Sequence, residues 1–242
     1  MAGISTYGLS REFGQLTEIC KRFVERLAER GITEERLKAG GDLVQIAKDK
    51  ETAALQAETV KEKLTEQEKK QGEVVVVLLR GVGNAVKKQF GRRSKEGRDF
   101  HIGEKITNTA AATLRCADDA AKAFPKYKSD LAQQGIVQAD MDTIKLAAAS
   151  LDATGSQHET AKRAAVQATA AAKAALNAAV KFVDSIHSAA LMEFTNEPAV
   201  LADFASAKKL RYQPRPRHSK SDDQAAAQEK VVALQPAVSK AS

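Results

Sequence analysis

Apolar residues recur every three or four positions along most of the chain, which is the spacing of one face of an α-helix. The longest such stretch, residues 156–194, is dominated by Ala and contains neither Gly nor Pro. Ser156 and Glu159 at its start have the spacing of a capping box, in which side chains bond to free backbone N–H groups. We therefore predict one long helix over 156–194, with a face of small side chains on which a neighbouring helix can pack closely.

Glycines divide the rest of the apolar pattern into shorter predicted helices. These cover residues 11–30, a short segment after Thr33, then 42–71, 73–90, 106–134 and a segment after Asp140. The glycines expected to end or interrupt them, as helix-ending residues often do, are Gly31, Gly40, Gly41, Gly72, Gly135 and Gly155. Pro125 lacks a backbone N–H, so it is expected to kink the helix over 106–134 or to start its last turns.

The segment 73–90 can be interpreted in two ways. Its first residues, EVVVVLL, are typical of a buried β-strand. The apolar positions continue through Val82, Val86 and Phe90, however, and that spacing is helical. The rest of the sequence offers no second strand to pair with, and a lone strand would leave its backbone groups without hydrogen bonds. We therefore predict a helix.

The two ends of the chain have a different pattern. Residues 1–10 have no clear periodicity and are predicted to be a flexible lead before a helical body over 11–207. From residue 208 the composition becomes basic, and the run YQPRPRH after it cannot be helical. Ser221 and Gln224 again have a capping spacing before a short apolar segment. We predict a flexible basic tail over 208–242, with room for one short docking helix.

A comparison of the sequence with itself suggests an internal repeat. When residue n is aligned with residue n + 104, Phe23–Ile32 falls on Tyr127–Ile136, with identical residues at four of the ten positions. The same offset aligns Leu37 with Met141, Leu78 with Phe182, Val82 with Ile186 and Phe90 with Phe194. Two unrelated amphipathic helices can also be aligned in part, so both explanations stay open. Either way the prediction is an all-α, elongated antiparallel (up-down) helical bundle, and a true repeat would make it two duplicated three-helix halves, 11–91 and 106–194.

The composition narrows the class of protein. Of 242 residues, 43% are hydrophobic and 29% charged, which is typical of a soluble folded protein. The longest apolar run, Val74–Leu79, is far too short to cross a bilayer, so no transmembrane segment is predicted. The first residues do not resemble a signal peptide. Cys20 and Cys116 are too few for a disulfide framework, and a cytoplasmic protein with reduced thiols is expected.

The net charge of +7 is concentrated in two places. Residues 87–98 contain six basic residues and one acidic residue, and residues 208–242 contain eight basic and three acidic residues. Such segments can contact an acidic partner. The residues predicted to make these electrostatic contacts are Lys87, Lys88, Arg92, Arg93, Lys95, Arg98, Arg211, Arg215 and Arg217.

Little in the sequence indicates a catalytic, metal-binding or phosphate-binding site. The nearest approach to a di-metal carboxylate motif is Asp184 with His187, and the chain lacks the matching residues on other helices. Neither cysteine follows a glycine turn or adjoins a histidine, and the Gly81–Gly83 segment lacks the lysine of a phosphate-binding loop. We predict no catalytic residue, no metal and no cofactor.

Function is therefore predicted only as a class, because no motif identifies a family. The first expectation is a non-enzymatic structural or adaptor protein that binds a protein partner, or itself, through apolar helix faces. The alternative is a weak, sequence-independent nucleic-acid binder that uses the basic segments. A further alternative is a coat on a granule or membrane surface, although the polar faces mix Lys with Glu and lack the aromatic residues of interfacial helices.

Overall fold

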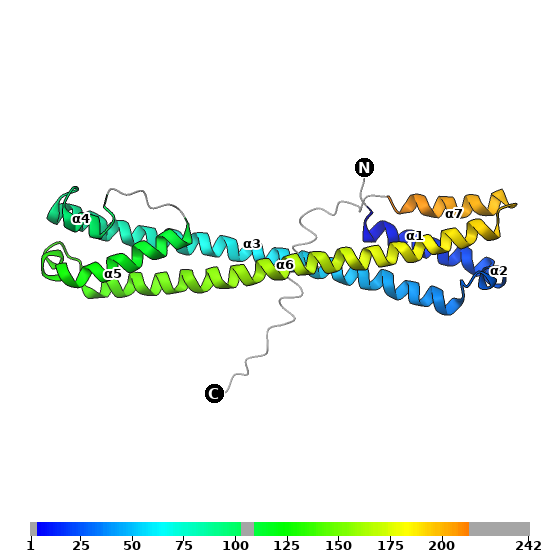
Figure 1. Cartoon of the computed structure of the whole chain (residues 1–242), viewed down its shortest axis with the longest axis horizontal. Helices are drawn as coiled ribbons and strands as arrows, with labels where there is room; N and C mark the ends of the chain where they lie inside the picture. The colour runs from blue at the N-terminus through cyan, green and yellow to red at the C-terminus, as the bar shows by residue number, and fades with distance from the viewer. Residues whose placement is uncertain (1–3, 103–108, 213–242) are drawn as a thin grey trace, which may run out of the picture. The chain divides into compact units, whose positions relative to one another are not determined.

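The computed structural model describes residues 4–102 and 109–212, and within these ranges all regular secondary structure is helical (Figure 1). The helices are α1 (Thr6–Arg22), α2 (Val24–Glu29), α3 (Glu34–Phe90), α4 (Lys95–Asp99), α5 (Ala110–Ala132), α6 (Gln138–Glu193) and α7 (Pro198–Leu210). The predicted all-α bundle is confirmed, and so is the helical assignment of 73–90. The tail beyond Tyr212, with Arg215 and Arg217, lies outside the described residues.

The predicted breaks inside the long helices are wrong. α3 continues through Gly40, Gly41 and Gly72, and α6 starts at Gln138 and continues through Gly155. A glycine inside a helix costs only about 1 kcal/mol relative to alanine, which is less than the burial of a continuous apolar face provides. At Gly40 the missing side chain is also needed, because a Cβ there would overlap the ring of Phe182 on α6.

The predicted capping box at Ser156 is wrong for the same reason. Ser156 lies in the middle of α6, and its carbonyl oxygen accepts a hydrogen bond from the hydroxyl of Thr160. The observed N-caps include Ser5 before α1, Thr33 before α3, Ser94 before α4 and Thr109 before α5. Their hydroxyls accept hydrogen bonds from the N–H groups of Gly8, Arg36, Gly97 and Ala112. α1 therefore begins at Thr6, inside the predicted lead. The segment between the predicted helices 73–90 and 106–134 contains α4, and α7 extends past the predicted end of the body at residue 207.

Helix kinks and turns occur at corresponding places in the two halves of the sequence. Phe23 (φ −127°, ψ 30°) separates α1 from α2, and Tyr127 (φ −120°, ψ 16°) kinks α5 just after Pro125. No proline lies near the kink at Phe23, so Pro125 cannot be the cause that both kinks share. Gly31 and Gly135 have φ values of 77° and 81° and end their helices as predicted, each in a left-handed conformation that suits glycine.

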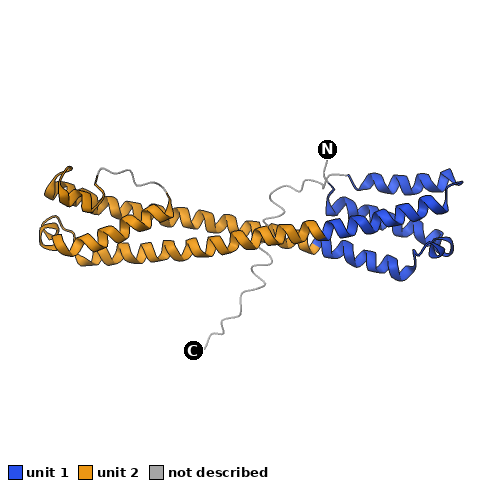
Figure 2. Cartoon of the chain, viewed as in Figure 1, with its two compact units in different colours: residues 1–48, 175–242 blue, residues 49–174 orange. Residues whose placement is uncertain are grey.

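The helices form two compact units, shown in different colours in Figure 2. Unit 1 consists of residues 1–48 and 175–242, so it contains α1, α2, the start of α3, the end of α6, and α7. Here α3 and α6 are antiparallel, because Arg36 lies beside Ser185 while the later Gly40 lies beside the earlier Phe182. The core side chains of unit 1 include Leu9, Leu16, Ile19, Leu27, Val44, Val183, Ile186, Phe194 and Phe204.

Unit 2 consists of residues 49–174, with the end of α3, α4, α5 and the start of α6. Its core side chains include Val75, Leu79, Val86, Phe100, Ala120, Phe124, Leu131, Met141, Ile144 and Leu151. At the offset of 104, several of these match buried residues of unit 1: Leu131 with Leu27, Phe100 with Phe204, Val86 with Ala190 and Leu151 with Ala47. Each unit thus uses helices from both halves of the sequence.

Candidate functional site

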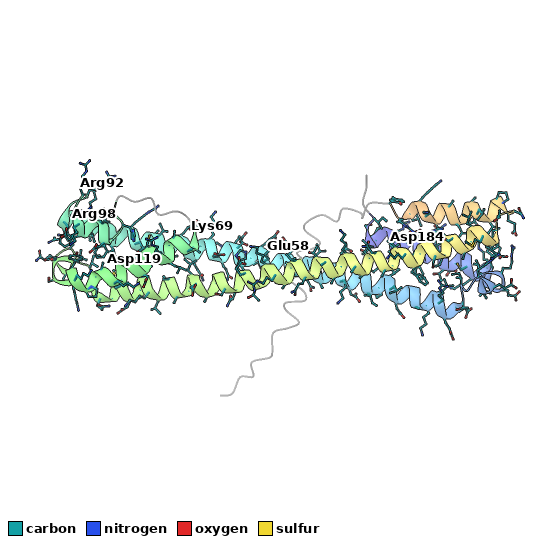
Figure 3. The ribbon with its side chains drawn as sticks, in the orientation of Figure 1. Glu58, Lys69, Arg92, Arg98, Asp119 and Asp184 are labelled. Atoms are coloured by element: carbon teal, nitrogen blue, oxygen red, sulfur yellow. The ribbon has the colours of Figure 1, made fainter. Side chains whose placement is uncertain are left out.

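The basic segment of the sequence forms an exposed surface in unit 2. α3 ends at Phe90, Gly91 turns the chain with φ 87°, and Ser94 caps α4. We define the basic surface as Lys87, Lys88, Arg92, Arg93, Lys95 and Arg98, all exposed. None of them forms an ion pair with a carboxylate in the described ranges. Figure 3 shows Arg92 and Arg98 at the same end of unit 2. Their positive charge is therefore open to a partner.

Aromatic packing holds this surface in place. Tyr127 on α5 lies between Phe90 and Phe100, with ring centroids 5.5 Å and 6.0 Å away. Its hydroxyl donates a hydrogen bond to Asp99 Oδ2 at 3.0 Å, and this bond to a carboxylate raises the pKa of Tyr127. Phe100 is buried, and Phe90 is partly buried. These rings support the basic surface from below, so they are not free to stack on nucleic-acid bases.

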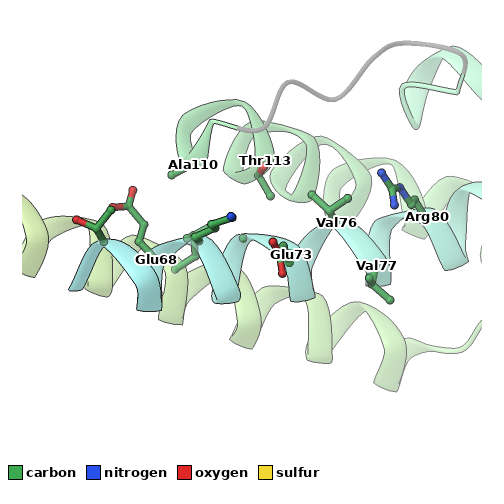
Figure 4. A pocket seen from close by; sticks show the side chains of 11 residues that line it. Glu68, Glu73, Val76, Val77, Arg80, Ala110 and Thr113 are labelled. Atoms are coloured by element: carbon green, nitrogen blue, oxygen red, sulfur yellow. The ribbon is translucent and has the colours of Figure 1, made fainter. Parts of the chain in front are cut away.

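A groove lies further along α3 in the same unit (Figure 4). Its volume is about 580 Å³. Along α3 it is lined mostly by polar residues, with Val76 and Val77 among them, and Ala110 and Thr113 of α5 face them. Two valines of α3 stand out, because Val77 in the groove is 63% exposed and its neighbour Val74 is 53% exposed. Exposed β-branched residues on a helix are unfavourable for helix formation and offer apolar area to a partner.

Arg211 is the one predicted contact residue that the structure contradicts. It is 3% exposed in unit 1, where its guanidinium binds both oxygens of the fully buried Glu12, at 2.6 Å and 2.9 Å. His187 donates from Nε2 to the same carboxylate at 2.7 Å, and Arg211 also reaches Asp184 Oδ1 at 2.8 Å. A buried charge needs such partners, so Arg211 is a structural residue and is not open to an acidic surface.

The sequence does contain a signal for this buried network. Glu12 lies on the same helical face as Leu9, Leu16 and Ile19, so a carboxylate interrupts an otherwise apolar row. A charged residue at such a position needs a buried partner of opposite charge. Nothing in the sequence identifies Arg211 as that partner, because 199 positions separate the two residues.

Other reactive groups in the described part of the chain are engaged structurally. Asp184 binds Arg211, and His187 binds Glu12. Within residues 4–102 and 109–212, no group of three or more side chains could hold a metal ion. Burial raises the pKa of the Cys20 thiol to about 11, which disfavours the reactive thiolate. In the same ranges, no helix is long and apolar enough to cross a membrane.

In comparisons with protein-family models, curated proteins and solved structures, nothing matches this chain. The candidate binding sites are therefore the two surfaces of unit 2, the basic surface and the groove.

Proposed function

We propose that this chain is a non-enzymatic adaptor whose unit 2 binds an acidic segment of a partner protein. The observation that carries the proposal is the basic surface itself, with six exposed cations that have no counter-ion in the described residues. Like charges held together destabilise a fold, so their clustering is best explained by an acidic ligand.

Unit 1 supports this interpretation because it provides an internal control. The six positions of the basic surface correspond, at the offset of 104, to Leu191, Met192, Asn196, Glu197, Ala199 and Ala202. None of these is basic, although buried residues around them align at the same offset, such as Val86 with Ala190 and Phe100 with Phe204. The fold therefore does not require cations at these positions.

We further propose that the two halves arose by duplication and that their surfaces then diverged. An experimental structure in which the two units fail to superpose would refute this.

The groove supplies a second, apolar contribution. Val74 and Val77 correspond to Ala178 and Lys181 in unit 1, so the exposed valines are also specific to unit 2. Covering them with a partner would gain roughly 25 cal/mol for each Å² of apolar surface buried. We therefore expect the partner segment to combine acidic residues with an apolar face. Self-association is the other form of this proposal, since such a partner can be a second copy of the chain.

Nucleic acid is the second candidate, because the same six cations could neutralise phosphates. One observation makes it the weaker one. The nearby aromatic rings of Phe90, Phe100 and Tyr127 pack against one another, so they are not available to stack on bases.

The proposal can be tested by fluorescence anisotropy with a labelled glutamate-rich peptide and a random duplex DNA. The full chain should bind the peptide at about 50 mM salt and more weakly at about 200 mM. Reversing three charges (Arg92→Glu, Arg93→Glu, Lys95→Glu) should weaken binding at least about tenfold, because rim charges act together in electrostatic attraction. The matched control reverses three exposed lysines elsewhere (Lys38→Glu, Lys50→Glu, Lys63→Glu) and should bind nearly as the wild type.

Each result has a definite meaning. Tighter binding of DNA than of the peptide, lost in the Arg92, Arg93 and Lys95 variant, would favour the second candidate. If neither ligand binds at low salt, or if both triple variants lose binding equally, the basic surface is not a binding site and the proposal is wrong.

A further inference from the structure

A small hollow opens between α4 and α5, beside the basic surface. Its volume is about 270 Å³, and four of its lining residues carry basic side chains. Arg98 comes from α4, His101 from the turn that follows it, and Lys122 and Lys126 from α5. Residues four apart on a helix lie on the same face, so both lysines can reach the same point. The hollow is therefore a place where several cations converge from two elements.

The two carboxylates in the hollow are already engaged by protein groups. His101 donates from Nε2 to Asp119 Oδ2 at 2.8 Å, and this hydrogen bond lowers the pKa of Asp119. Asp99 accepts a hydrogen bond from the hydroxyl of Tyr127 at 3.0 Å. By contrast, Arg98 and Lys126 have no ion pair in the described ranges, and Lys122 pairs with Asp118 outside the hollow. Two cations are thus left to face a ligand.

The turn after α4 fixes the position of His101 in the hollow. His101 has φ 55°, in the left-handed region, which histidine adopts more often than most residues with a side chain. It ends α4 in the usual way, because the N–H of Ile102 bonds to the carbonyl oxygen of Gly97 at 2.8 Å and the N–H of His101 to that of Arg98 at 3.0 Å. This conformation places the imidazole of His101, which is only 15% exposed, against Asp119. The contact holds the Asp119 carboxylate, which would otherwise repel an anion in the hollow.

We propose that this hollow binds the phosphoryl group of a phosphorylated serine or threonine in the acidic partner. A phosphoryl dianion has three acceptor oxygens, and the guanidinium of Arg98 and the ammonium group of Lys126 match its double charge and donate hydrogen bonds to it. The hollow is small, as a site for a single such group should be. This inference rests on the proposed function and deepens it, because it names a chemical feature of the partner.

Unit 1 lacks the same arrangement. The positions that correspond to Arg98, His101, Lys122 and Lys126 are Ala202, Ala205, Glu18 and Arg22. The single cation among them, Arg22, is paired with Asp203 at 2.9 Å. The phosphoryl site is therefore confined to unit 2, next to the basic surface.

The test compares three versions of one glutamate-rich peptide, with a central serine, phosphoserine or glutamate, bound to the full chain. The phosphoserine peptide should bind at least about tenfold more tightly than the glutamate peptide, because the phosphoryl group has the higher charge and more acceptors. The double variant Arg98→Gln, Lys126→Gln should weaken the serine peptide to some extent, because Arg98 also belongs to the basic surface, but it should bring the phosphoserine peptide down to the affinity of the glutamate peptide. The control Arg92→Gln, Arg93→Gln should weaken all three peptides by a similar factor.

Several results would overturn the inference. One is equal affinity for the phosphoserine and glutamate peptides, and another is a preference that persists in the Arg98, Lys126 variant. If duplex DNA displaces the phosphoserine peptide and its own binding is lost in that variant, the source of the phosphoryl group is nucleic acid and not a protein.

Failure of the proposed function can be told apart from failure of the site. If no peptide binds, the adaptor proposal fails, and inorganic phosphate then tests the hollow directly by amide NMR. Shifts confined to residues 98–101 and 122–126 that vanish in the Arg98, Lys126 variant would support a phosphoryl site. The absence of such shifts at millimolar phosphate would overturn it.

Discussion

In unit 1 the helix that follows α6 is α7, with thirteen residues, whereas in unit 2 the helix that follows α3 is α4, with five. α7 packs on α1 so closely that Gly8 touches the backbone of Leu210 and Arg211. Arg211 then binds the buried Glu12. The corresponding positions of Gly8 and Glu12 in unit 2 are Ala112 and Cys116, and the helix after α3 is too short to make this contact.

This difference shows how one helical pattern can carry two kinds of chemistry. The core residues, the kinks at Phe23 and Tyr127, and the turns at Gly31 and Gly135 agree between the units. Charged residues do not follow that agreement. In unit 1 the buried pair of Arg211 and Glu12 holds α7, while in unit 2 the six cations of the basic surface are exposed between the end of α3 and α4. The pair in unit 1 therefore contributes to stability, and the contrast supports the proposed binding role of the basic surface in unit 2.

The largest expected effect is on the stability of unit 1. Arg211→Ala leaves the fully buried Glu12 without its main partner, which should destabilise unit 1 by about 3–5 kcal/mol. Glu12→Gln should cost less, because Arg211 keeps its ion pair with Asp184. Urea denaturation followed by circular dichroism measures the loss, and hydrogen exchange locates it in α1 and α7. The control Arg92→Ala, an exposed cation of unit 2, should change stability by less than about 0.5 kcal/mol; an equal loss in both variants would contradict the comparison.

Substitution of either of two glycines of α1 should have an intermediate effect on stability, and the two effects should have opposite signs. Gly8→Ala forces a Cβ into the backbone of Arg211 and should destabilise the chain by about 1–3 kcal/mol. Gly14→Ala meets no atom within 4 Å, so the gain in helix propensity should stabilise it by about 0.5–1 kcal/mol. Thermal unfolding of the two variants measures both changes. Equal shifts in the same direction would show that α7 does not lie on Gly8.

The smallest effect concerns the two cysteines, one in each unit. Burial raises the pKa of Cys20 to about 11 from 9.0 in the unfolded chain, so the folded state favours the neutral thiol. The stability that this provides is complete below pH 9.0 and is lost as the pH rises toward about 11. Cys20→Ala should remove this part of the loss of stability at alkaline pH, as measured by urea denaturation at several pH values.

Alkylation at pH 8, analysed by mass spectrometry, should modify the partly buried Cys116 before the buried Cys20. Faster reaction of Cys20 would contradict its burial.

Local sequence signals predicted much of the fold. Apolar spacing indicated the helical class and resolved 73–90 as a helix, and Gly31 and Gly135 end helices as expected. The continuity of α3 and α6 could not be predicted, because it depends on packing between distant residues, such as Phe182 beside Gly40. The start of α1 was missed although Ser5 is a good N-cap residue, since only two apolar side chains follow it closely.

The residues of the candidate site were likewise predicted only in part from the sequence. The clustering of basic residues in 87–98 identified the six cations of the basic surface, because so many charged side chains in a short segment are exposed in almost any fold. Arg211 was predicted wrongly, since its partner Glu12 lies at the other end of the chain. Lys122 and Lys126 were missed, because they converge with Arg98 only after α5 packs beside α4.

The most direct test of the assignment of binding to unit 2 is amide NMR of the full chain with the glutamate-rich peptide. Both units contain the corresponding segments, residues 87–102 and 191–206, so one spectrum compares them. The account predicts shifts that saturate with peptide in 87–102, and none of similar size in 191–206. Shifts in 191–206, or equal shifts in both segments, would contradict it.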